Sequence, residues 1–149
     1  MDDIKNDATV KFLFEKVDEY NIGNRLVIEL TEDEELTHPE NIRKVKCFMK
    51  RLSLKRGCKF ALDDFGKGYA TFDPLVHLKF DYIKLDRVLT KDFLEDERKF
   101  YLINQLSEYA KRVKMKIIAE YIEKEEEKIA MEYMKVDYLQ GYYLHKPEI

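Results

Sequence analysis

Two adjacent aspartates, Asp63 and Asp64, follow the apolar residues FAL and stand directly before the glycine-rich stretch FGKGY. Such a pair can form a solvated turn, because Asp accepts hydrogen bonds from nearby backbone and Gly adopts positive φ freely. It can also bind a hard cation, because carboxylate oxygens are the ligands that Mg²⁺ and Mn²⁺ prefer. Taken alone, the residues from Phe60 to Tyr69 favour the turn.

Polar groups also stand near the C-terminal ends of the other apolar runs that are typical of strands. They are Glu29 in LVIEL, Lys84 in DYIKL, Glu120 in KIIAE and Gln140 in DYLQGYY. A single group of this kind is usually a helix cap or a loop anchor. Five runs in succession indicate a shared site, because ligands bind at the C-terminal edge of a parallel sheet.

The charges of this predicted site indicate its chemistry. Glu29, Asp63, Asp64 and Glu120 would repel one another strongly, so we expect divalent cations to offset them. Paired Mg²⁺ or Mn²⁺ ions favour phosphate chemistry, because they clamp oxygens and lower the pKa of a bound water. Lys84 would then neutralise phosphate charge or hold the attacking water. A simple salt bridge from Lys84 to one of the acids is an equal alternative.

Helices and strands alternate in the elements that must position these groups. Periodicity and stop signals predict helices over 8–20 with Gly23 as the stop, from the capping-box segment Thr37 to Glu40 up to Gly57, at 73–78, along 100–113 and over 124–134. Glu125, Glu126 and Glu127 are expected to face solvent. Runs rich in branched residues predict strands at 26–30, 60–64, 81–86, 115–120 and 137–143. This alternation predicts an α/β fold with about five parallel strands.

Length and composition limit the function classes. The 149 residues fit one domain, and 27 Lys plus Arg against 30 Asp plus Glu argue against a surface for DNA or RNA. Cys47 and Cys58 have no Cys or His at metal spacing, so neither a disulfide framework nor a zinc site is indicated. There is no apolar run of membrane-spanning length and no signal peptide. We expect a soluble, cytoplasmic segment without membrane contact, although upstream regions of a longer parent could carry an anchor.

Four ordered segments resemble a known family. LVIELTEDE, FALDDFGKGYATFDPLVHLKFDYIKLDR, IIAEYIEKEEE and DYLQGYYLHKP are similar, in order and spacing, to the successive motifs of EAL domains, the bacterial cyclic di-GMP phosphodiesterases. The resemblance implies a TIM-like (β/α) barrel whose first strand runs against the others, Mg²⁺ or Mn²⁺ as cofactors, and cyclic di-GMP as ligand. An unrelated flavodoxin-like α/β domain would fit the strand count but not the four segments.

The resemblance also implies a role for each matching residue. Metal binding falls on Glu29, Asp63, Asp64 and Glu120. Lys84 resembles the lysine that contacts the catalytic water, and Glu120 also resembles the residue that accepts its proton. Supporting roles fall on Glu123, which would hold the loop after the aspartates, on Gln140 at the floor of the site, and on Gly66, Gly68 and Tyr69 in a loop that the family ties to substrate binding and dimerisation.

The chain departs from the family pattern in several places. Tyr121 replaces the glycine of the family's A-E-G-V-E block and is expected to crowd the rim of the site, and Lys67 and Ala70 stand where Thr and Ser are usual. The E-A-L segment that names the family is absent from the chain. The Asn that ends the family's third strand is absent as well.

A full barrel needs about 200 residues or more, so we expect residues 1–149 to be a truncated EAL domain, the C-terminal part of a longer protein. The expected parent hydrolyses cyclic di-GMP to linear pGpG, and this part alone is expected to be inactive because ligands of the first metal are missing. The alternative is a degenerate EAL module that binds the nucleotide or a protein partner without turnover. Open edges of a five-stranded sheet further predict a homo-oligomer.

Overall fold

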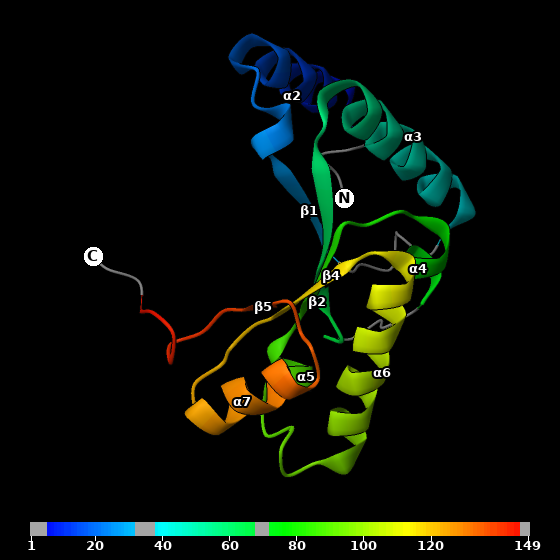
Figure 1. Cartoon of the computed structure of the whole chain (residues 1–149). Coiled ribbons are helices and arrows are strands. Elements are labelled where there is room, and N and C mark those ends of the chain that lie inside the picture. Colours follow the sequence, from blue (N-terminus) through cyan, green and yellow to red (C-terminus); the bar gives the residue numbers. More distant parts are fainter. Residues whose placement is uncertain (1–5, 32–37, 68–71, 147–149) are drawn as a thin grey trace. The chain divides into compact units, whose positions relative to one another are not determined.

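The computed structural model of the chain describes residues 6–31, 38–67 and 72–146. Predictions that rest on Thr37, Gly68, Tyr69 and Ala70 lie outside these ranges. Strands alternate with helices along the chain (Figure 1). The strands are parallel, and their order in the sheet is the order in which they follow one another along the chain. The strands are β1 (Val27–Thr31), β2 (Lys59–Phe65), β3 (Tyr82–Leu85), β4 (Lys116–Ala119) and β5 (Tyr138–Leu139). The predicted α/β fold with five parallel strands is confirmed.

The chain divides into two compact units. The first takes in residues 1–62 and 69–80, and the second takes in residues 63–68 and 81–149. Strand β2 passes from one unit to the other after Leu62, so Asp63 and Asp64 belong to the second unit. Glu29 on β1 belongs to the first. The acids predicted to share one site therefore come from different units.

Helix α2 (Asp7–Tyr20) opens the described part of the first unit. The side chain of Asn6 accepts a hydrogen bond from the backbone N–H of Ala8 at 3.0 Å, which caps the helix. The helix ends at Asn21, whose φ of 49° is left-handed, so the prediction that Gly23 ends it is wrong. Gly23 instead begins the 3-10 turn η1 (Gly23–Arg25), where a Cβ would stand 2.1 Å from the carbonyl oxygen of Arg56.

Helix α3 (Pro39–Arg56) packs against α2 within the first unit (Figure 1). His38 precedes it without a side-chain cap, and Gly57 ends it as predicted, with a φ of 73°. Its buried face carries Val45, Phe48, Met49 and Leu52. The short helix α4 (Asp73–His77) confirms the predicted helical turn.

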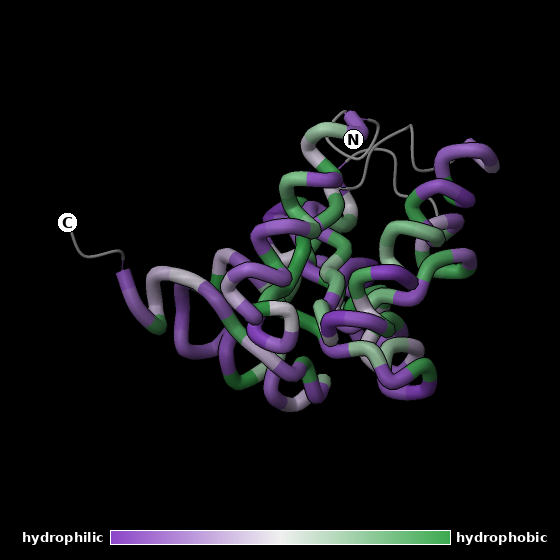
Figure 2. The backbone as a smooth tube through the Cα atoms, turned by 90° about the horizontal axis from the view of Figure 1, so that it is seen from above, coloured by the Kyte–Doolittle hydropathy of each residue, from purple (hydrophilic) through white to green (hydrophobic). Residues whose placement is uncertain are grey.

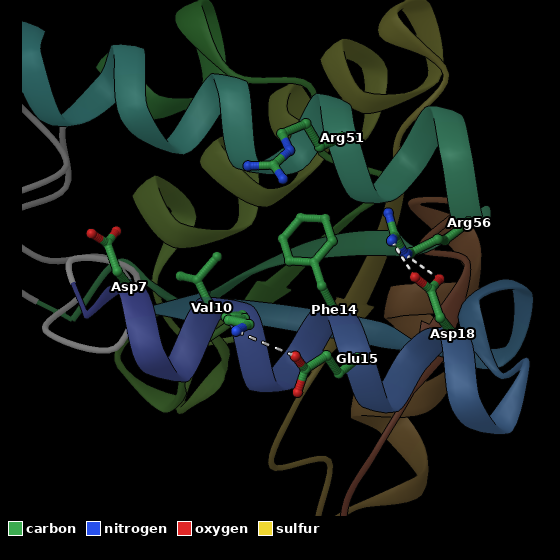
Figure 3. Close-up of a pocket in the computed structure, with 8 residues that line it drawn as sticks. Asp7, Val10, Phe14, Glu15, Asp18, Arg51 and Arg56 are labelled. Carbon is green, nitrogen blue, oxygen red and sulfur yellow. Dashed lines mark hydrogen bonds and ion pairs between the residues drawn. The ribbon is translucent and has the colours of Figure 1, made fainter.

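An aromatic ring and two arginines join α2 to α3. The ring of Phe14 meets the ring of Phe48 edge to face, with centroids 6.2 Å apart. The guanidinium carbons of Arg51 and Arg56 lie 4.6 and 4.5 Å from the centre of the Phe14 ring (Figure 3). Arg56 also donates two hydrogen bonds to Asp18, one of them from Nε at 2.6 Å. These contacts stabilise the helix pair through packing, cation–π attraction and an ion pair.

The second unit pairs β3 with β4 and β4 with β5. The register runs from Tyr82 opposite Lys116 to Leu85 opposite Ala119, and Ala119 stands opposite Leu139. The helices of this unit are α5 (Arg87–Thr90), α6 (Glu97–Val113) and α7 (Glu125–Tyr133). Hydrophobic and hydrophilic residues alternate along the helical turns (Figure 2), and α6 buries Ile103, Leu106, Ser107 and Ala110.

Two expectations about the second unit are corrected. The last strand spans two residues rather than 137–143, because Ile122 donates to the carbonyl of Gln140 and Tyr143 donates to the carbonyl of Ile122, both at 3.0 Å, in a turn beyond the strand. Glu127 is buried rather than solvated, because its Oε2 accepts hydrogen bonds from the backbone N–H groups of Glu123 at 2.8 Å and Lys124 at 3.1 Å. It secures the start of α7.

The helices of residues 6–31, 38–67 and 72–146 are either too short or too polar for a bilayer. None of them is both long and apolar enough to cross a membrane. Location in the cytoplasm stays a prediction.

Candidate functional site

Lys84 of β3 forms the centre of a charged cluster in the second unit. Its Nζ lies 2.9 Å from Oδ1 of Asp63 and 3.1 Å from Oε1 of Glu120. The three side chains are only 12%, 18% and 12% exposed, respectively. The salt bridge that was an equal alternative for Lys84 is therefore present, and one ammonium group serves two carboxylates.

The strand geometry explains why these groups meet. Asp63 stands near the end of β2, Lys84 lies within β3, and Glu120 directly follows β4. The N–H of Glu120 donates to the carbonyl of Leu85 at 3.3 Å, which continues the β3–β4 pairing by one residue. Ends of parallel strands share one edge of the sheet, so the predicted gathering of these three residues is found.

Asp64 takes a different direction from Asp63. Its φ of 57° is left-handed, a conformation that Asp adopts more readily than most residues. Its N–H donates to Oδ1 of Asp63 at 3.0 Å, and its own carboxylate lies 3.2 Å from Nζ of Lys67. That hydrogen bond raises the pKa of Lys67 above its usual value. Asp64 thus makes the turn, whereas Asp63 supplies a half-buried carboxylate to the cluster around Lys84.

Gly66 allows this turn to pass close to α5. Its φ is 102°, and a Cβ at this position would stand 2.7 Å from the side chain of Leu89. Both the conformation and the space favour glycine. The roles predicted for Gly68 and Tyr69 in the same loop lie outside the described residues and stay predictions.

Sequence reasoning missed Asp86, which links two of the strands at the site. Asp86 is buried, its N–H donates to the carbonyl of Phe65 at 3.1 Å, and its Oδ1 accepts from the N–H of Val88 at 2.9 Å. It therefore ties β3 to the end of β2 and caps α5. An Asp directly before a helical run is a known capping signal, so DRVLT could have predicted this role.

Beside the cluster lies a pocket of about 250 Å³. Its lining includes Glu120, Glu123 and Gln140, three residues that the sequence assigned to the site, together with Arg87, Tyr121, Gly141 and Tyr142. The terminal nitrogen of Arg87 lies 4.0 Å from Oε1 of Glu123. The role predicted for Glu123, holding the loop after the aspartates, stays a prediction.

The metal ligands predicted from the sequence are only partly accounted for. Glu29 lies on β1 in the first unit, where its residue is exposed, and its role as a ligand stays a prediction. Across residues 6–31, 38–67 and 72–146, no three side chains of His, Cys, Asp or Glu gather closely enough to hold a metal ion. The second unit nevertheless offers the carboxylates of Asp63 and Glu120 beside Lys84, a set of groups suited to a phosphate ester and a hard cation.

Comparisons with known proteins agree with the motifs. The family model described as "EAL domain" matches residues 2–147. The cyclic di-GMP phosphodiesterase PdeF of Escherichia coli (strain K12) is 32% identical over 124 residues, which are 83% of this chain and 16% of that protein. The chain thus spans a small part of the length of this relative.

Solved structures share the fold. An EAL domain protein from Listeria monocytogenes EGD-e superimposes with a TM-score of 0.77 and 30% identity, covering 97% of this chain and 56% of that one. The manganese and cyclic di-GMP complex of Klebsiella pneumoniae BlrP1 at pH 6 superimposes with a TM-score of 0.79 and 26% identity, covering 93% of this chain and 34% of that one.

Proposed function

The chain belongs to the EAL domain family, and on this basis we propose that it is the part of a cyclic di-GMP phosphodiesterase that carries Asp63, Lys84 and Glu120. The observation that carries the proposal is the placement of Lys84 between the half-buried carboxylate of Asp63 and the buried carboxylate of Glu120 in the second unit, 2.9 and 3.1 Å away. Membership of the EAL family supports cyclic di-GMP as the substrate and its hydrolysis as the reaction. The cluster around Lys84 contains groups able to take part in that reaction.

Asp63 and Glu120 are the residues of the second unit best suited to hold Mg²⁺ or Mn²⁺. Their carboxylates are hard oxygen donors, and together they outnumber the ammonium group between them. Asp64 and Glu29 would extend the ligand set. A bound metal would lower the pKa of a water and offset the charge of the phosphodiester.

Other residues of the cluster and the pocket would act on the water and the nucleotide. Lys84 would hold the attacking water or neutralise phosphate charge, since its half-buried ammonium is already oriented by two carboxylates. Glu120 would accept the proton of the water, because it lies at the same cluster and also lines the pocket. Glu123 and Gln140 would support the nucleotide from the other walls of the pocket.

One observation favours a second candidate function, binding of the nucleotide without hydrolysis. No three metal-ligating side chains gather within the described ranges, so the chain by itself can lack the ligand set that a two-metal reaction needs. In this case the same pocket recognises cyclic di-GMP and passes the signal to a protein partner. A homo-oligomer is also proposed, since β1 and β5 are the outermost strands of the sheet.

Hydrolysis and binding measured on this chain separate the two candidates. Cyclic di-GMP is incubated with the chain and Mn²⁺ or Mg²⁺ and the products are separated by chromatography, while calorimetry with EDTA measures binding. Conversion to a linear dinucleotide that disappears in Asp63→Asn supports the enzyme. Binding without conversion supports the second candidate, and absence of both contradicts the two proposals.

A matched pair of lysine variants controls for loss of charge. Lys84→Met removes the central ammonium, whereas Lys44→Met removes the charge of an exposed lysine on α3. Only the first variant should lose hydrolysis or nucleotide binding. Light scattering on the unmodified chain tests the oligomer, and a monomer at all concentrations would contradict that part.

A further inference from the structure

Tyr121 holds a backbone conformation that does not suit its side chain. It directly follows Glu120, and its φ of 61° lies in the left-handed region that bulky residues rarely adopt. The matching block of EAL domains has a glycine at this position, and glycine adopts such a φ freely. Backbone strain of this kind is found most often at functional sites, so the Tyr121 side chain is a candidate for a functional role.

The ring of Tyr121 is placed against a cation. The guanidinium carbon of Arg87 lies 5.8 Å from the centre of the ring, within the range of a cation–π contact. Arg87 is itself 4.0 Å from the carboxylate of Glu123, so the cation is held from a second side. Tyr121 nevertheless remains 46% exposed, which leaves aromatic surface for a ligand.

The same ring lines the pocket beside the charged cluster. The pocket has a volume of about 250 Å³ and includes Glu120, Gln140 and Tyr142 among its walls. Pockets for whole drug-sized ligands usually measure about 300–1,000 Å³, so this one suits one planar ring system rather than an entire cyclic dinucleotide. Aromatic side chains bind such rings by stacking, because every nucleobase presents a π face.

We propose that Tyr121, held by Arg87, is a nucleotide-binding residue whose ring stacks on one purine base of the nucleotide. The side-chain amide of Gln140 on the pocket wall would pair with the edge of that base, since an amide both donates and accepts hydrogen bonds. This inference rests on the proposed function, because it assigns the base of the same ligand whose phosphates meet the cluster at Lys84.

Three tyrosine variants test the stacking. Tyr121→Asn removes the ring and suits the left-handed φ, because Asn visits that region more readily than Tyr. Tyr121→Phe keeps the ring and removes only the hydroxyl. Tyr133→Asn is the matched control, since Tyr133 is 79% exposed on α7 and does not line the pocket.

Calorimetry with cyclic di-GMP and EDTA measures the dissociation constant of each variant. Tyr121→Asn should weaken binding about tenfold, the scale that stacking on one base supplies. Tyr121→Phe and Tyr133→Asn should stay within about twofold of the unmodified chain on the same scale. A melting temperature for Tyr121→Asn equal to or above that of the unmodified chain shows that weaker binding is not caused by unfolding. Equal or tighter binding by folded Tyr121→Asn overturns the inference.

The NMR signal of the guanine H8 proton provides an independent reading of stacking. It should move upfield on binding to the unmodified chain and to Tyr121→Phe, and the movement should be lost with Tyr121→Asn. Failure of the inference differs from failure of the proposed function: if the unmodified chain binds the nucleotide and Tyr121→Asn binds it equally well, only the inference falls. If the folded, unmodified chain binds no cyclic di-GMP, both fall.

Discussion

The contact of Arg56 with carboxylate in the first unit and that of Lys84 in the second unit are built differently. In the first unit, Arg56 meets the carboxylate of Asp18, with side chains that are 16% and 57% exposed. In the second, Lys84 meets both Asp63 and Glu120, and all three side chains are at most 18% exposed. The first contact pairs one positive with one negative charge at the surface, whereas the second holds two carboxylates and one ammonium group with little exposure to water.

This difference distinguishes an ion pair that only stabilises the fold from a charged cluster that could bind a ligand. Arg56 uses two nitrogens on one carboxylate and lies over the ring of Phe14, so its contacts are used in joining helices. The cluster at Lys84 joins strand ends, stands beside a pocket and keeps a negative balance that an added cation can offset. A cluster that is unbalanced in charge and has little exposure to water is the better candidate for chemistry.

The largest expected effect comes from Lys84→Met. The variant leaves two carboxylates near each other with little water, so it should cost about 3 kcal/mol of folding free energy, the lower end of the range for breaking buried pairs because some exposure remains. Chemical denaturation measures this loss. Adding Asp63→Asn to the variant should restore part of the stability, since it removes the repulsion. An unchanged denaturation midpoint for Lys84→Met would contradict the buried character of the cluster.

The next effect is stabilisation by a divalent cation at the second unit. Mn²⁺ at roughly 100 times its dissociation constant should stabilise the chain by about 2.7 kcal/mol. Thermal melting with Mn²⁺ and with EDTA measures the shift, which Asp63→Asn should abolish. Asp18→Asn in the first unit is the control and should retain the shift. A shift that survives Asp63→Asn would mean that the cation binds elsewhere.

A smaller effect is expected from Arg56→Met in the first unit. Asp18 stays mostly in water when its partner is removed, so the loss of stability should be well below that of Lys84→Met. Nucleotide binding by the second unit should be unchanged. Denaturation curves of Lys84→Met and Arg56→Met, recorded side by side, test which variant loses more stability. The reverse order would show that the helix junction contributes more than the cluster.

The smallest effect is a dependence on pH at Asp18. The hydrogen bond from Arg56 lowers the pKa of Asp18 in the folded chain, whereas an unfolded aspartate has a pKa of about 3.9. The stabilisation is therefore complete above the unfolded pKa and is lost as the pH falls through the lowered folded pKa. The stability difference between the unmodified chain and Asp18→Asn should hold from neutral pH down to about 4 and then shrink. Denaturation across this range measures it, and a difference that grew on acidification would have the wrong sign.

Helices in which apolar residues recur regularly over several turns were predictable from the sequence, whereas the end of the last strand was not. The buried stripes of α3 and α6 repeat at three and four residues, so both helices were found, and the stop of α3 at Gly57 was found as well. The run 137–143 looks like a strand, yet Tyr142 and Tyr143 lie in a turn because backbone groups of Ile122 bond there. Such contacts between distant segments leave no local signal.

The same limit applies to the site. The type and spacing of Asp63, Lys84 and Glu120 predicted their meeting, because strand order brings polar strand ends to one edge. The left-handed turn at Asp64 and the contact of Arg87 with Tyr121 depend on backbone angles and on a helix that the sequence reading missed. The roles of Glu29, Glu123 and Gln140 stay predictions.

Gly141 shows how a position without any functional group can govern this region. A Cβ there would stand 2.1 Å from the carbonyl oxygen of Ile122 and 2.3 Å from its nitrogen, both backbone atoms. A screen of random substitutions would therefore rank position 141 among the essential ones, next to the charged residues of the pocket. Substitutions of Gly141 would fail because a Cβ collides with the backbone of Ile122. Alanine scanning of this pocket wall would therefore suggest a role in binding or catalysis that Gly141 does not have, unless folding is measured together with activity.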